Sequence, residues 1–250
     1  ESLGSNSGES PEAVPFRLRM FYPDGSEFER SGNGLRVLGA YLFAEGRVEM
    51  GRPFPVEVGG DRVEMVILSQ DEKEVLDVAV HMGRVQFGVA AVGGKAEMFG
   101  ARTTLTAPGE APLPVQPVSV GNPHCVAFRD RLDEDEFVRL GPWLASHSAI
   151  PRGTNVQFAR VLDSGGIEIL IWERGVGRTA SSGTSACAVA SAAVHQSLLP
   201  PGRIPVLMEG GAFYITVSPD MDVRLEGPVQ SIMQGALTQP KLRELVEVSG

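Results

Sequence analysis

The sequence has few cysteines, few aromatic residues and less basic than acidic charge. Its two cysteines in 250 residues are too few for a disulfide framework and lack the spacing of metal ligands. The net charge of −9 argues against a general nucleic-acid binder, which usually presents a basic face. No apolar run approaches the roughly 18 residues of a membrane span, and no signal peptide pattern is present. We therefore expect a globular, cytoplasmic protein that binds no metal, nucleic acid or membrane.

Glycine and proline are abundant, with 30 and 18 copies. Together they make up about 19% of the chain against an average near 12%, which predicts many short strands and turns. Alternating or apolar runs predict strands at 16–21, 63–68, 85–89, 155–161, 167–172, 204–209 and 213–217. The four prolines of segment 107–117 indicate a linker, so we expect an N-terminal lobe at 1–110 and a C-terminal lobe at 111–250.

Two apolar helices each follow a cluster of serine and glycine, one beginning at Ser31 and the other at Ser182. A helix N-terminus carries unpaired N–H groups and a partial positive charge, so two that face each other would hold a carboxylate. The simpler interpretation is that both serines only cap their helices. Further helices are expected at 133–140 and 239–248.

Several motifs follow one another between residue 19 and about residue 190. They are RMFYPDGSE at 19–27, SGNGLR at 31–36, GNPH at 121–124, LGP at 140–142, Ser146-His147, Asn155, ERGVG at 173–177, and Thr179, Gly183-Thr184 and Ala186-Cys187-Ala188. In this order and spacing they resemble the diaminopimelate epimerase family.

The resemblance implies an α/β fold of two pseudo-symmetric lobes, each a mostly antiparallel sheet wrapped around a central helix. The family's site lies in the cleft between the lobes and needs no cofactor. One cysteine thiolate removes the α-proton of an amino acid, and a second cysteine returns a proton on the opposite face. We accordingly expect a cofactor-independent amino-acid epimerase or racemase of amino-acid biosynthesis. Its partner would be a small amino-acid substrate, and the resemblance also suggests a homodimer.

By the same resemblance, Ser31 and Ser182 stand where the family has its two catalytic cysteines. His124 and Glu173 would lie beside the first and second of these positions and assist the hydroxyls, since serine is a far weaker acid than cysteine and needs a general base. The substrate-binding residues implied are Gly32, Asn33, Asn122, Asn155, Glu173, Arg174, Gly183 and Thr184. The remaining thiols, Cys125 and Cys187, are expected to pack in the core.

The sequence also departs from the family at sites of specificity. Tyr22 replaces an asparagine and Arg178 replaces a glutamate, which puts diaminopimelate itself in question as the substrate. A segment that precedes Phe16 in the family and lines its site is absent here, so we expect either a fragment or a more open cleft. Two alternatives stay open: an inactive paralogue that binds an amino acid, and a dehydratase that abstracts a proton from one face only.

Overall fold

The computed structural model describes residues 15–21, 25, 27, 31–100, 103–233, 235–236 and 238–240. Most of the helix expected at 239–248 lies outside these residues, as does Tyr22. The helices are α1 (Gly32–Ala44), α2 (Glu134–Ala145) and α3 (Gly183–His195), with short 3₁₀ helices η1 (Ala90–Val92) and η2 (Ala96–Met98). The strands are β1 (Phe16–Leu18), β2 (Phe54–Val58), β3 (Asp61–Gln70), β4 (Leu76–Arg84), β5 (Gln86–Phe87), β6 (Thr104–Leu105), β7 (Leu113–Pro114), β8 (Gln116–Ser119), β9 (Pro123–Phe128), β10 (Asn155–Val161), β11 (Ile167–Glu173), β12 (Gly177–Thr179), β13 (Gly202–Met208), β14 (Gly211–Val217) and β15 (Asp222–Val229).

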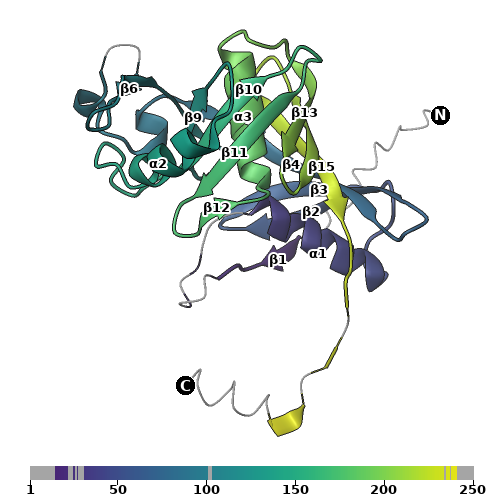
Figure 1. The fold of residues 1–250 in the computed structure, drawn as a ribbon. Helices are drawn as coiled ribbons and strands as arrows, with labels where there is room; N and C mark the ends of the chain where they lie inside the picture. Colours follow the sequence, from purple (N-terminus) through teal and green to yellow (C-terminus); the bar gives the residue numbers. More distant parts are fainter. Residues whose placement is uncertain are drawn as a thin grey trace, which may run out of the picture.

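One strongly curved sheet of 13 strands runs through the protein (Figure 1). Its order is β1-β2-β3-β4-β15-β14-β13-β11-β10-β9-β8-β5, and β12 pairs with β11. Most neighbouring strands are antiparallel, whereas β1–β2, β9–β10 and β11–β13 are parallel. Strand β15 lies between β4 and β14 and so joins the two halves of the sheet.

Each half of the sheet wraps around one helix. Helix α1 packs against β3, β4 and β15, and α3 packs against β8 to β11 and β13 to β15. The two helices also contact each other, and Figure 1 shows α3 enclosed by strands above α1. The predicted α/β architecture, in which sheet wraps around a central helix in each half, is confirmed, although the two halves share one continuous sheet. The lobe boundary at residue 110 stays a prediction.

Two hydrophobic cores hold this arrangement. The larger core contains α1, α3 and the inner face of the sheet. The smaller core lies under α2 on the other face of β9 and β10, where the rings of Phe137 and Phe158 meet edge to face at 5.2 Å. Cys125 and Cys187 are fully buried in the cores, as expected. Burial raises the pKa of the Cys125 thiol to about 12, so this group stays protonated.

Several segments differ in extent from what the sequence predicted, and the helix expected at 133–140 continues to Ala145. The strand expected at 16–21 covers only Phe16–Leu18. The strand expected at 85–89 is reduced to β5 because Gly88 has a φ of +97° and η1 begins two residues later. The supposed linker at 107–117 contains β7 and the start of β8, because Leu113 and Val115 are buried in the smaller core. None of the helices in the described ranges is long and apolar enough to cross a membrane.

Candidate active site

The N-termini of α1 and α3 meet at the centre of the protein. A Cβ placed on Gly32 would lie 3.3 Å from the Cα of Gly183 and 2.9 Å from the Leu225 side chain. A Cβ placed on Gly183 would lie 2.9 Å from the Leu225 side chain and 3.3 Å from both the Cα of Gly32 and the Arg36 guanidinium, so any side chain at either position would crowd the contact between the helices. Each helix start directs free N–H groups and a partial positive charge outwards, and the two together form a site suited to an anion.

A serine occupies the N-cap position of each helix, but the two hydroxyls differ. Ser31 Oγ accepts a hydrogen bond of 3.1 Å from the backbone N–H of Gly34 and so caps α1. Ser182 has the same extended backbone conformation, is almost fully buried, and its hydroxyl does not cap α3. The Ser182 hydroxyl therefore makes no hydrogen bond to the backbone of α3 as an N-cap.

A buried arginine that the sequence analysis did not single out for a role supports the start of α1. The guanidinium of Arg36 donates to the Gly32 carbonyl at 3.3 Å and to Asn33 Oδ1 at 2.8 Å, and it stacks over the Phe213 ring at 4.2 Å. Burial lowers the pKa of Arg36 to about 10, which leaves it charged at neutral pH. A role for Arg36 could have been predicted from the sequence, because it is the only charged residue of this apolar helix.

A second group of predicted residues gathers at the adjoining ends of β9, β10 and β11. His124 and Asn155 are register partners in the parallel pair β9–β10. Asn122 Oδ1 lies 2.9 Å from His124 Nε2. Asn155 donates to the Pro123 carbonyl at 3.1 Å and accepts from the backbone N–H of Arg174 at 2.9 Å. The two asparagines therefore fix the loops that carry the other site residues.

The electrostatics of His124 differ from those of an exposed histidine. The ring is completely buried, and this burial lowers its pKa to about 3. The Gln157 side chain raises the pKa of His124, and the positive charge of Arg174 lowers it further. His124 is consequently neutral throughout the physiological range.

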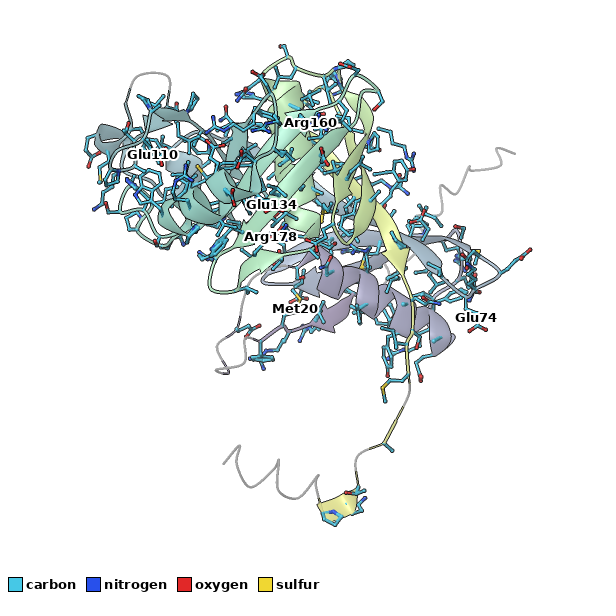
Figure 2. All side chains as sticks on the ribbon, in the orientation of Figure 1. Met20, Glu74, Glu110, Glu134, Arg160 and Arg178 are labelled. Atoms are coloured by element: carbon cyan, nitrogen blue, oxygen red, sulfur yellow. The ribbon has the colours of Figure 1, made fainter. Side chains whose placement is uncertain are left out.

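Glu173 and Arg174 lie at the turn between β11 and β12. Glu173 is half-buried and is the register partner of Gly177, and Arg174 donates from its guanidinium to the Arg152 carbonyl at 3.0 Å. On the next strand, Arg178 pairs with Glu134 at the start of α2 and with Glu209 at 2.6 Å. Figure 2 shows Arg178 and Glu134 side by side, so this ion pair joins the β11–β12 turn to α2.

Helix α3 connects the two groups of residues. Its first residue, Gly183, contacts Gly32 of α1, and Thr184 is buried in the same turn. Ser185, one residue further, accepts a hydrogen bond of 2.9 Å from Gln157 on β10. The sequence analysis missed Gln157 and Ser185, although a glutamine inside an apolar strand was a usable signal. Within the described residues, no three histidine, cysteine or acidic side chains are grouped as metal ligands.

The fold of this chain is similar to those of a solved epimerase and a solved probable racemase. A hydroxyproline epimerase from Agrobacterium vitis matches with a TM-score of 0.66 at 14% identity, over 86% of this chain and 69% of that one. A probable proline racemase from Agrobacterium radiobacter matches with a TM-score of 0.65 at 15% identity, over 91% of this chain and 74% of that one. At these identities the likeness establishes the fold.

The sequence comparisons are more specific. A sequence model described as diaminopimelate epimerase matches residues 117–232. Diaminopimelate epimerase 2 of Nostoc sp. is 37% identical over 226 residues, which cover 89% of this chain and 76% of the relative. The diaminopimelate epimerase of Desulforudis audaxviator is 36% identical over 224 residues, 89% of this chain and 79% of the relative. The chain belongs to the diaminopimelate epimerase family, a family of amino-acid isomerases.

Proposed function

We propose that this protein is a cofactor-independent amino-acid epimerase or racemase that transfers protons at Cα, between the N-termini of α1 and α3. The observation that carries the proposal is the contact of Gly32 with Gly183, which brings two helix starts together with a hydroxyl at each N-cap. The N–H groups of both helices would hold the α-carboxylate and the negative charge that develops during deprotonation. Ser31 and Ser182 would then face the two sides of the Cα atom.

The hydroxyls need assistance, because a serine is too weak an acid to exchange protons unaided at neutral pH. Neutral His124 keeps a lone pair on one ring nitrogen that could accept a proton, and Glu173 supplies a half-buried carboxyl group. We assign His124 to Ser31 and Glu173 to Ser182. The hydroxyl of Ser182, which does not cap α3, is available to such a partner.

The substrate in this proposal is a zwitterionic amino acid. Asn33 is exposed at the start of α1, and Asn122, Asn155 and Arg174 lie together at the strand ends, where they would bind the distal part of the substrate. The names of the relatives make diaminopimelate the first candidate and lysine biosynthesis the first candidate pathway. Tyr22 and Arg178 are the two positions that would shift this specificity. A cytoplasmic location and a homodimer belong to the same proposal.

The test is proton NMR of α-hydrogen exchange in D2O with a panel of amino acids that includes meso-diaminopimelate. We expect exchange by the unmodified protein and its loss in Ser31→Ala/Ser182→Ala, which removes both hydroxyls and little else. The variant Ser31→Cys/Ser182→Cys should exchange faster, because a thiol at a helix N-terminus is the stronger acid.

The other outcomes distinguish the alternatives. Amino-acid binding without exchange, together with exchange in the double-cysteine variant, would indicate an inactive binding paralogue. Exchange coupled to loss of water from a hydroxylated amino acid would indicate a dehydratase. Absence of both binding and exchange in every variant would contradict an enzymatic role for the described site.

A further inference from the structure

Three buried polar side chains lie between the sheet and the first turn of α3: His124, Gln157 and Ser185. All three are completely buried. The register of β9 with β10 places His124 opposite Asn155, so Gln157 lies two residues further along on the same face. Ser185 faces them from α3 and accepts the 2.9 Å hydrogen bond from Gln157 Nε2.

Two atoms of this group stand out because they have no hydrogen-bond partner within the described residues. They are Nδ1 of His124 and Oε1 of Gln157. Leaving a buried polar atom unpaired destabilises the folded state, so two such atoms close to each other suggest that they pair. One atom can carry a proton and the other can only accept one, so a single hydrogen bond would pair both.

The contact of Gln157 with Ser185 gives the direction of this bond. Because Gln157 donates through Nε2 to Ser185, its Oε1 is the atom left for the ring. Gln157 is also the group that raises the pKa of His124 against the effects of burial and of the Arg174 charge, as an acceptor near the ring should. On the other side, Asn122 Oδ1 lies 2.9 Å from Nε2, so the Nδ1–H form requires the carboxamide of Asn122 to turn its Nδ2 towards the ring.

We propose that Gln157, held in place by Ser185, accepts a hydrogen bond from Nδ1–H of His124 and fixes this tautomer of the ring. Nε2 then keeps its lone pair on the Asn122 side, where it can take up a proton. Gln157 and Ser185 are positioning residues, since they act through His124. The partner of one ring nitrogen commonly decides the state of the other in histidines that transfer protons. The catalytic meaning of this tautomer rests on the proposed function.

The test reads the tautomer directly by 15N NMR of protein labelled at histidine, which needs no activity. We expect Nδ1 of His124 to be protonated and Nε2 to be unprotonated at pH 7. In Gln157→Leu the ring should switch to the Nε2–H form. Gln157→Glu places a carboxylate beside Nδ1–H, which should raise the titration midpoint of His124 against the opposing charge of Arg174.

Serine variants keep the proposal testable if a change at Gln157 prevents folding. Ser185→Ala should weaken the Nδ1–H form, and Ser185→Thr, which keeps the hydroxyl, should restore it. The matched control is Ser191→Ala on the same helix, whose buried hydroxyl has no partner within the described residues and whose loss should leave the His124 signals unchanged. An Nε2–H ring in the unmodified protein, or equal effects of Ser185→Ala and Ser191→Ala, would overturn the inference.

Activity gives a separate readout. If exchange occurs, Gln157→Leu should lower kcat at least tenfold with little change in KM, because the substrate contacts stay in place. If no exchange occurs in any variant, the proposed function fails while the tautomer measurement still decides this inference.

Discussion

At the residue scale, Ser31 and Ser182 occupy equivalent N-cap positions with different hydrogen bonding. Since Ser31 caps α1 through Gly34, we expect Ser31→Ala to lower the free energy of unfolding by about 1 kcal/mol. Ser182→Ala should cost clearly less, because that hydroxyl does not cap α3. Urea denaturation of both variants tests the difference, and equal losses would contradict the assignment.

His124 should make stability depend on pH. Its pKa is about 3 in the folded protein and 6.5 without burial, so the unfolded chain binds the proton more strongly between these values. The contribution of neutral His124 to the free energy of unfolding is complete above pH 6.5. It is lost as the pH falls towards 3, by up to about 1.4 kcal/mol per pH unit. The free energy of unfolding should therefore fall less steeply from pH 6.5 to 4 in His124→Gln than in the unmodified protein. Parallel curves would show that His124 is not neutral in the folded state.

The sequence allowed individual site residues to be predicted unevenly. Ser31, Ser182 and His124 lie in short motifs, so their neighbours along the chain identify them. Gln157 and Ser185 meet across 28 positions of sequence, and neither lies in a motif that suggests this contact. Their pairing depends on the register of β10 against α3, which residue types alone do not determine.

At the element scale, the close approach of α1 and α3 depends on the absence of a side chain at Gly183. We expect Gly183→Ala to destabilise the fold by about 1–3 kcal/mol, because the new methyl group would press on Leu225, on Arg36 and on the backbone of Gly32. Gly235→Ala is the control, since no atom lies within 4 Å of the added carbon. If Gly183→Ala leaves the free energy of unfolding in urea unchanged, the two helix starts are further apart than described.

The helices were easier to predict than the strands. Serine and glycine before an apolar run located the starts of α1 and α3, and the acidic residues after Asp133 located α2. Strand ends depended on partners elsewhere in the chain. The bend at Gly88 ends β5, and the buried Leu113 draws the proline-rich segment into the smaller core.

At the scale of the whole molecule, the sheet is continuous because β15 pairs with both β4 and β14. We therefore expect the described fold to unfold in one cooperative transition. Both tryptophans, Trp143 and Trp172, lie in the second half, whereas the fully buried Met65 lies on β3 in the first half. Met65→Ala should cost about 2–5 kcal/mol.

The measurement is urea unfolding of Met65→Ala followed by tryptophan fluorescence and by far-UV circular dichroism. Both midpoints should fall together, although the substitution is in the half without tryptophan. An unchanged fluorescence midpoint would show that the two halves unfold independently.

The position of β15 also has a consequence for synthesis of the chain. A ribosome completes β4 long before it reaches Asp222–Val229, which forms the strand beside it. Until then one edge of β4 exposes unpaired N–H and C=O groups, the kind of edge on which other chains can pair. The nascent first half therefore stays open until β15 emerges, and an interruption of translation before that point would release a chain prone to aggregate.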